Sequence, residues 1–216
     1  MALVRFPDPR DATPEGIVAF GGRPDPDFLA EAYAKGIFPW PVEGYPLLWF
    51  SPPERAVLIF EELHVPRSLA RERRRTRLSF TVDRAFERVI RACASAERAN
   101  EEGTWITPEM IRGYCEFHRR GGAHSVEAWE GGELVGGVYG VDAGGAFAGE
   151  SMFYRRPNAS KLTLLFLIEH LKGRGLDWLD IQVMTPHMQA LGARLVSRDE
   201  FLQRLARTRR RGLKLF

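Results

Sequence analysis

The chain has 216 residues, of which 44% are hydrophobic, and its formal net charge at pH 7 is +3. These values exclude an intrinsically disordered chain and allow one large domain, or a main domain with a small partner. The longest apolar run, residues 162–168, is far shorter than the ~20 residues that a membrane-spanning helix needs. No apolar signal region is seen in residues 1–10, and both cysteines lie in helical patterns, so a reduced, cytoplasmic protein is expected.

Loop-forming residues dominate the first quarter of the chain. Residues 1–22 are rich in proline and glycine, and a helix is predicted from Asp25-Pro26 to Gly36, because Asp is a good N-cap and Gly ends helices. Residues 37–54 are rich in proline and aromatic residues, which indicates an ordered loop rather than a regular element. We therefore predict a small N-terminal domain at residues 1–58 and a main domain at residues 59–216.

The main domain alternates strand-like and helix-like segments. Strands are predicted at residues 56–60, 78–82, 123–130, 134–141, 146–154 and 176–183. Helices are predicted at residues 66–75 and 158–173, and others begin at Asp83, Thr107, Thr185 and Ser197. Glycine pairs separate the three strands between residues 123 and 154, which is typical of hairpins. This order predicts an α+β fold in which helices flank a mostly antiparallel sheet.

Basic residues gather in two segments, 67–77 and 204–214, while the rest of the chain is net acidic. Such patches suit a phosphate-rich partner such as a nucleic acid, although two solvated helix faces would give the same pattern. The candidates for contact with a tRNA backbone are Arg71, Arg73, Arg74, Arg75 and Arg77. The second segment is predicted to be a basic C-terminal tail that either joins this surface or is solvated.

Polar side chains interrupt two of the predicted strands. Glu150 lies within residues 146–154, and Asp180 and Gln182 lie within residues 176–183. Because strand side chains alternate between faces, Asp180 and Gln182 are predicted to share a face, and neighbouring strands would bring Glu150 beside them. Burying such groups without partners costs on the order of 2–7 kcal/mol each. The three side chains therefore either form a structural hydrogen-bond network or serve a ligand.

Six short motifs follow one another along the chain. They are Gly36-Ile37-Phe38-Pro39-Trp40, Glu102-Gly103-Thr104-Trp105-Ile106-Thr107, His124-Ser125-Val126-Glu127 with Trp129, Gly149-Glu150-Ser151-Met152-Phe153, Asn158-Ala159-Ser160-Lys161 and Leu179-Asp180-Ile181-Gln182. In this order they resemble the bacterial leucyl/phenylalanyl-tRNA–protein transferases, over residues 21–192. The resemblance implies a GNAT-like acyltransferase core and a protein that acts as a monomer without a cofactor.

The resemblance also implies a reaction. The family transfers leucine, phenylalanine or sometimes methionine from aminoacyl-tRNA to proteins that begin with arginine or lysine, which creates an N-degron. An α-amine has a pKa near ~8, so a polar group must orient its neutral form and accept its proton. The resemblance assigns this relay to Asp180 and Gln182, and it places Glu150 beside them, where it would hold the ammonium or a basic side chain. The ester is already activated, so no metal is expected, and the cysteines and histidines show no metal-ligand spacing.

An apolar pocket for the aminoacyl side chain is implied as well. Its candidate residues are Val138, Phe147, Met152, Leu164, Leu167 and Leu179. Each of them, taken alone, is more typical of an ordinary core position. Family members usually carry Met and Phe where Val138 and Leu167 stand, which leaves the preference for leucine or phenylalanine open. The candidates for the tRNA and peptide end are Trp40, Trp105, Asn158 and Ser160, and the two tryptophans would equally suit packing between domains.

Three further functions remain open at this point. One is a peptidoglycan-type aminoacyltransferase, which would prefer a lipid-linked lysine amine to a protein. A coenzyme A-dependent GNAT acetyltransferase needs a glycine-rich turn with free backbone N–H groups, but residues 155–160 hold no glycine, and Pro157 has no N–H. This composition argues against coenzyme A and for another acyl carrier. A tRNA- or RNA-binding module without turnover would share the basic segments.

Overall fold

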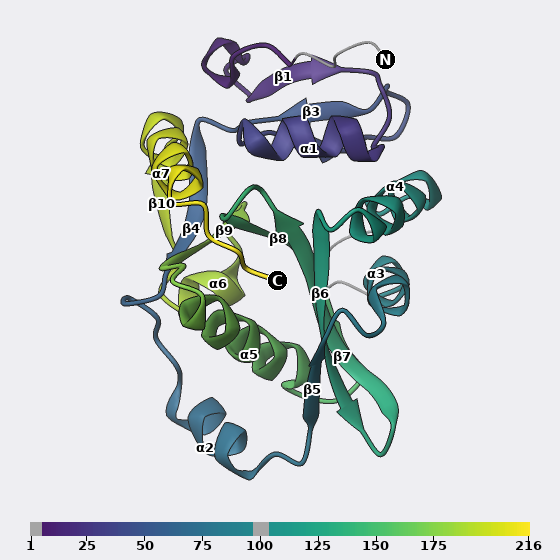
Figure 1. Cartoon of the computed structure of the whole chain (residues 1–216), viewed down its shortest axis with the longest axis vertical. Helices are drawn as coiled ribbons and strands as arrows, with labels where there is room; N and C mark the ends of the chain where they lie inside the picture. The colour runs from purple at the N-terminus through teal and green to yellow at the C-terminus, as the bar shows by residue number, and fades with distance from the viewer. Residues whose placement is uncertain (1–5, 97–103) are drawn as a thin grey trace.

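The computed structural model describes residues 6–96 and 104–216, and they form two sheets (Figure 1). The smaller sheet has the order β1-β3-β2 and is antiparallel. Its strands are β1 (Ile17–Phe20), β2 (Phe38–Trp40) and β3 (Leu48–Phe50), accompanied by helix α1 (Pro26–Ala34) and the 3-10 helix η1 (Pro9–Asp11). The prediction of a loop for residues 37–54 was therefore wrong for β2 and β3, whereas residues 41–47 and 51–53 do lie outside helices and strands. These strands are too short for a periodic pattern, and Pro39 is tolerated because β2 is an edge strand.

The larger sheet has seven strands in the order β10-β4-β9-β8-β7-β6-β5. The strands are β4 (Glu54–Ile59), β5 (Ser79–Val82), β6 (Ala123–Glu130), β7 (Glu133–Asp142), β8 (Phe147–Tyr154), β9 (Trp178–Gln182) and β10 (Arg194–Ser197). The sheet is mixed, which corrects the expectation of a mostly antiparallel one. β8 and β9 run parallel because helix α5 (Ala159–Gly173) carries the chain from the end of β8 back to the start of β9.

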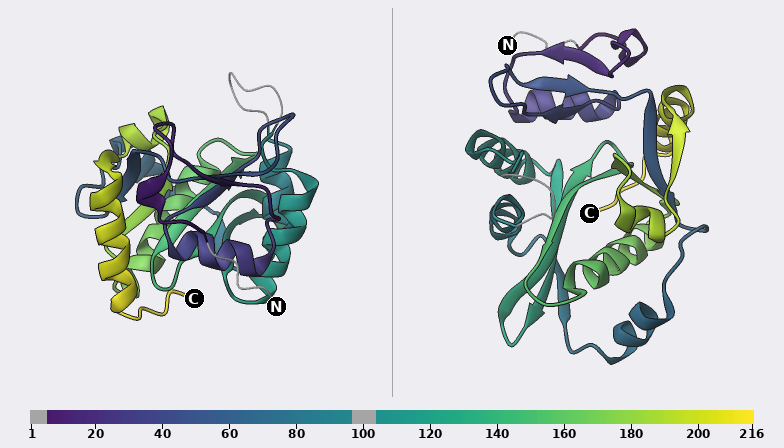
Figure 2. Two further views of the ribbon diagram at one scale, coloured as in Figure 1. Left: turned by 90° about the horizontal axis from the view of Figure 1, so that it is seen from above. Right: turned by 180° about the vertical axis from the view of Figure 1, so that it is seen from behind.

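Helices cover both faces of the larger sheet (Figures 1 and 2). On one face lie α3 (Phe86–Ala94) and α4 (Pro108–Arg119), and α4 also contacts α1. On the other face lies α5, with α2 (Arg67–Arg75) against it. The short helix α6 (Pro186–Ala190) follows β9, and α7 (Arg198–Arg210) packs beside β10 and β4. α1 and the smaller sheet lie together at one end of the larger sheet (Figure 1).

The last segment of the chain is packed against this fold. α7 buries Phe201, Leu202 and Leu205, and Leu215 beyond it is fully buried. The predicted basic C-terminal tail is thus an ordered helix with one exposed basic face. The predicted domain boundary at residue 58 falls inside β4, and it stays a prediction. Among residues 6–96 and 104–216, no helix has the length and apolarity needed to span a membrane.

Candidate active site

A cavity of about 620 Å³ opens where β8 and β9 separate. The two strands pair only through Ala148 and Asp180, and the residues that follow on each strand line the cavity. Those residues are Gly149 and Glu150 on β8, and Ile181 and Gln182 on β9. Parallel strands that diverge at their carboxyl ends leave backbone and side-chain groups free to face a ligand. Ligands bind in crevices of this kind in other folds.

Both strands carry a β-bulge at this point. In the β7–β8 ladder Tyr139 faces Ser151 and Gly140 faces Gly149, so Glu150 is the extra residue. In the β4–β9 ladder an irregularity separates the residues opposite Asp180 and Gln182, which leaves Ile181 unpaired. A bulge breaks the alternation of side chains and re-aims them. Asp180 and Gln182 therefore do not share a face, although strict alternation predicted that they would.

Apolar side chains form most of the cavity wall. Five of the predicted pocket residues line it, namely Val138, Met152, Leu164, Leu167 and Leu179. The sixth, Phe147, is fully buried outside the cavity, against a small void beside Asp180, so its expected position is corrected. The sequence did not point to the residues that follow β9, where Val183, Met184, Pro186 and Met188 complete the wall.

Glu150 is the carboxylate that faces the cavity. Its Oε1 accepts hydrogen bonds from the Tyr33 hydroxyl at 2.6 Å and from Gln182 Nε2 at 2.5 Å, and its Oε2 accepts one from the Tyr114 hydroxyl at 3.2 Å. Burial raises the pKa of Glu150 to about 7, although these hydrogen bonds oppose the rise. The carboxyl can therefore gain or lose a proton near neutral pH.

No sequence pattern pointed to the two tyrosines that donate to Glu150. Tyr33 lies on α1, 117 positions before Glu150, and Tyr114 lies on α4. Their hydroxyls are 2.5 Å apart, and burial raises the pKa of both well above the usual value. Both therefore stay neutral donors. Gln182 lines the cavity, and its remaining amide atom, Oε1, has no hydrogen-bond partner among the described residues.

Asp180 points away from the cavity, toward Arg55 on β4. Arg55 Nε donates to Asp180 Oδ1 at 2.8 Å, and a terminal nitrogen of the same guanidinium donates to Oδ2 at 2.7 Å. Both side chains are almost fully buried, at 1% and 5% exposed. The expected position of Asp180 at the mouth of the cavity is therefore corrected. The reason is the bulge at Ile181 together with a buried arginine that the sequence pattern did not connect to β9.

Trp40 and Trp105 stand together at the cavity. Their rings stack at 5.6 Å with an angle of 11° between their planes, and both side chains are partly buried. The motif that contains Trp105 begins with Glu102 and Gly103, which lie outside the described residues. Asn158 and Ser160 lie at the start of α5 and do not line the cavity. Asn158 Nδ2 instead donates to Glu72 of α2 at 2.5 Å, which ties α2 to α5.

The predicted tRNA-contact arginines lie on and after α2, and all are exposed. Arg73 forms an ion pair with Glu169 of α5. The other four have no ion pair with any residue that the structure describes; they are Arg71, Arg74, Arg75 and Arg77. The surface of α2 therefore carries free positive charge.

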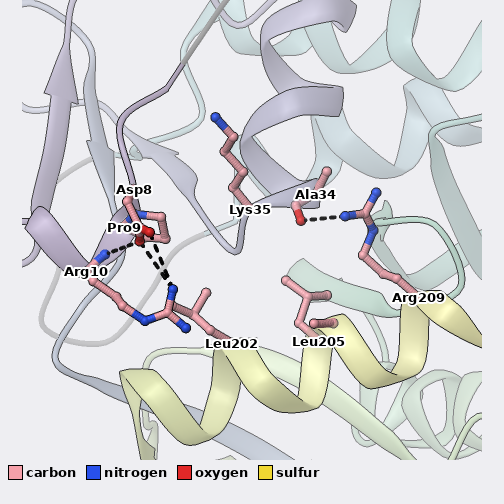
Figure 3. Close-up of a pocket in the computed structure, with 9 residues that line it drawn as sticks. Asp8, Pro9, Arg10, Ala34, Lys35, Leu202, Leu205 and Arg209 are labelled. Atoms are coloured by element: carbon pink, nitrogen blue, oxygen red, sulfur yellow. Dashed lines mark hydrogen bonds and ion pairs between the residues drawn. The ribbon is translucent and has the colours of Figure 1, made fainter.

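Two other features of the structure were candidates for a functional site. A hollow of about 400 Å³ lies between η1, the end of α1 and α7, but its charged groups already pair within the fold (Figure 3). Arg10 pairs with Asp8, and Arg209 donates to the carbonyl of Ala34 at 2.9 Å. This hollow is therefore a joint between the N-terminal segment and α7.

The second feature is a cluster of Asp83, His118 and His124, whose possible ligand atoms lie within 4.8 Å of one another. Asp83 Oδ2 lies 2.7 Å from His124 Nδ1, and Asp83 Oδ1 accepts from the backbone N–H of Ser125 at 2.8 Å. His118 Nδ1 lies 2.8 Å from the carbonyl of Ala123, and His124 Nε2 lies 3.1 Å from the carbonyl of Gly121. These hydrogen bonds hold the start of β6 and explain the cluster.

Comparison with known proteins finds related sequences along most of the chain. The family model described as leucyl/phenylalanyl-tRNA protein transferase matches residues 57–206, and the model of that family's N-terminal domain matches residues 22–53. The leucyl/phenylalanyl-tRNA–protein transferase of Anaeromyxobacter sp. (strain Fw109-5) is 53% identical over 94% of this chain and 87% of its own length. That of Desulfatibacillum aliphaticivorans is 47% identical over the same shares. A solved ribosomal-protein-alanine N-acetyltransferase from Brucella melitensis biovar Abortus 2308 overlaps 52% of this chain and 84% of its own, at 16% identity and a TM-score of 0.35, too low to support a conclusion. The chain belongs to the leucyl/phenylalanyl-tRNA–protein transferase family.

Proposed function

We propose that this protein transfers an aminoacyl group from tRNA to the α-amine of an acceptor protein that begins with arginine or lysine. The aminoacyl group is leucine, and also phenylalanine or methionine, and the product carries an N-degron. The reaction takes place in the cytoplasm, on a single copy of the chain with a GNAT-like core. Family membership supports the reaction class, and the geometry of the cavity supports the choice of groups.

One observation carries the proposal. The pair Glu150 and Gln182, joined at 2.5 Å, stands at the edge of a cavity whose wall is otherwise mostly apolar. The cavity volume, about 620 Å³, lies within the range that is usual for small-ligand sites. An apolar or aromatic side chain such as that of leucine or phenylalanine fits such a space, and the polar pair then stands next to the ester that carries it.

The pair suggests how the amine is activated. Gln182 Oε1 accepts a hydrogen bond from the neutral amine. This bond directs the lone pair of the amine nitrogen at the ester carbonyl carbon. The nitrogen–carbon bond forms, and the bond from that carbon to the ribose oxygen of tRNA breaks. Glu150 takes the amine's proton, because its pKa lies near 7, and the proton then passes to the leaving ribose oxygen. The ester supplies the energy of the step, so the residues only orient groups and move one proton.

Further residues are assigned to binding. Val138, Met152, Leu164, Leu167 and Leu179 hold the aminoacyl side chain. The stacked pair of Trp40 and Trp105 holds the terminal adenosine or the acceptor peptide, since each ring offers an aromatic face next to the cavity. The α2 arginines contact the tRNA backbone, while Asn158 at the start of α5 holds α2 in place through Glu72.

The experiment is a transfer assay with labelled Leu-tRNA and a peptide that begins with arginine. Labelled peptide is expected, and the same peptide with an acetylated N-terminus is expected to stay unlabelled because it has no α-amine. Parallel assays with Phe-tRNA and Met-tRNA rank the aminoacyl groups. Binding of tRNA in a gel shift without transfer would favour a binding module. Transfer from labelled acetyl-coenzyme A instead would favour an acetyltransferase.

The tRNA surface is tested separately. Replacing Arg71, Arg74 and Arg75 by glutamate is expected to weaken tRNA binding and to reduce the salt slope by about 0.7–0.9 for each lost phosphate contact. Arg91→Glu is the matched control, because Arg91 is an exposed arginine on α3, on the opposite face of the sheet. Equal affinity of the triple variant and the control at low salt would remove α2 from the tRNA surface.

A further inference from the structure

We propose that Arg55 and Asp180 form a clamp that positions Gln182, and that neither of them takes up the proton of the attacking amine. The inference rests on the transfer reaction proposed above. It makes Arg55 a positioning residue that acts through Asp180 and the backbone of β9, and it leaves Glu150 as the only carboxylate that faces the reacting groups among the described residues that line the cavity.

The pair is sealed from the cavity. Both oxygens of Asp180 accept from the guanidinium, at 2.8 and 2.7 Å, and neither Arg55 nor Asp180 lines the cavity. The guanidinium itself lies between two aromatic rings, 4.5 Å from the centre of Phe38 and 4.4 Å from that of Phe201. A carboxylate held in this way has no free path to an amine in the cavity.

The clamp acts on the backbone of Gln182. The backbone N–H of Gln182 donates to Asp180 Oδ1 at 2.9 Å, and Gln182 has a φ of 61°, a left-handed conformation that residues other than glycine rarely adopt. The unpaired Ile181 precedes it in the bulge. The carboxylate therefore fixes the one turn of the backbone that directs the Gln182 side chain to Glu150.

Arg55 also reaches the other partner of Glu150. Its remaining terminal nitrogen donates to the carbonyl of Gly36 at 3.3 Å, and Gly36 follows the end of α1. α1 carries Tyr33, whose hydroxyl donates to Glu150 at 2.6 Å. One buried guanidinium thus connects both elements that supply hydrogen bonds to the same carboxylate oxygen.

Two neutral double variants separate a clamp from a proton acceptor. R55Q/D180N removes both charges but keeps an oxygen that can accept from the N–H of Gln182. R55M/D180L also removes both charges and fills the space, but it offers no acceptor. Neither variant leaves a buried charge without a partner, which is the usual reason for such proteins to fail to fold.

The clamp predicts different results for the two. R55Q/D180N is expected to keep kcat within about tenfold of the unaltered protein, with an unchanged KM for Leu-tRNA and an unchanged midpoint in the pH profile of kcat. R55M/D180L is expected to lose at least a further tenfold in kcat at the same KM. If Asp180 took the proton, both variants would be equally inactive, which would overturn the proposal. Equal activity in both variants near the unaltered level would overturn it as well.

A second measurement does not depend on activity. Amide hydrogen exchange at Gln182 is expected to be at least tenfold faster in R55M/D180L than in R55Q/D180N. Equal exchange would overturn the clamp whether or not transfer is found, whereas absence of transfer by the unaltered protein would overturn only the proposed function. Arg194→Gln is the control, since it removes an arginine from an exposed pair with Glu62, and it is expected to change neither exchange nor kcat.

Discussion

Glu150 and Asp180 are two carboxylates on adjacent parallel strands; Glu150 is the bulged residue of β8, and Asp180 directly precedes the bulge of β9. They differ in what surrounds them. Glu150 faces a cavity, and its partners are two tyrosine hydroxyls and one amide, all of them uncharged. Asp180 faces the opposite way and meets a guanidinium that occupies both of its oxygens.

This difference explains which carboxylate can move a proton. Uncharged donors stabilise a carboxylate only in part, so burial dominates at Glu150 and raises its pKa to about 7. A guanidinium supplies a full opposite charge, so Asp180 is held as one half of an ion pair. Strand position and residue type are nearly the same at the two sites. The partners, which come from α1, α4 and β4, decide the role of each acid.

The largest effect is expected from Glu150→Gln. This change keeps the shape of the side chain but removes the group that takes the amine's proton, so kcat for transfer should fall by about 10²–10⁴-fold. Initial rates of labelled leucine transfer check it. Glu133→Gln, an exposed change on β7, is the control and should leave kcat unaltered. A Glu150→Gln protein with normal kcat would make the two carboxylates equivalent and would remove Glu150 from the mechanism.

Arg55→Gln is expected to destabilise the fold strongly. It leaves the buried Asp180 without its opposite charge, and breaking a buried pair in this way costs about 3–5 kcal/mol of unfolding free energy. Urea denaturation measures the loss. R55Q/D180N should recover most of it, because neither charge then remains buried. A small loss in Arg55→Gln, similar to that of a surface substitution, would mean that Asp180 finds another partner.

The sequence predicts the walls of this site better than its polar centre. The family resemblance implied Val138, Met152 and Leu164 as pocket residues, and all three line the cavity. The local apolar pattern by itself predicts only that such positions lie in strands or helices that face the core. The tyrosine and the arginine that govern the two acids lie 117 and 125 positions away from them, and no local pattern records such contacts. The bulges also defeat the rule of alternation on which the placement of Asp180 depended.

The same limit applies to the fold. The strands of the larger sheet between residues 123 and 154 were predictable because glycine turns separate long segments. The three-residue strand at Phe38–Trp40 was not, since its pairing with Leu48–Phe50 depends on tertiary contacts that override the proline signal. The parallel pairing of β8 with β9 depends on where α5 returns the chain, which order along the sequence leaves open.

A third prediction uses pH to separate the acids. Folding raises the pKa of Glu150 from 4.5 to about 7, so between these values the folded protein binds a proton that the unfolded chain releases. The free energy of unfolding should therefore fall as pH rises through this window, by up to about 3 kcal/mol from this group. Urea titrations of the unaltered protein and of Glu150→Gln, compared across the window, isolate the contribution. An identical decline in both would show that other groups cause it.

The smallest effect is expected from Tyr33→Phe, which removes one uncharged donor of Glu150 and keeps the ring. Tyr114 still donates to Oε2 and Gln182 to Oε1, so the carboxyl loses only one of its three hydrogen bonds. Loss of one hydrogen bond costs about 1 kcal/mol when Glu150 is protonated and about 2 kcal/mol when it is charged. Because the bond from Tyr33 lowers the pKa of Glu150, its removal should shift the rising part of the kcat–pH profile to higher pH. A profile that stays in place would show that Tyr33 supports α1 alone. The difference between Glu150 and Asp180 would then have to be explained by the burial of Glu150 and its hydrogen bond from Gln182.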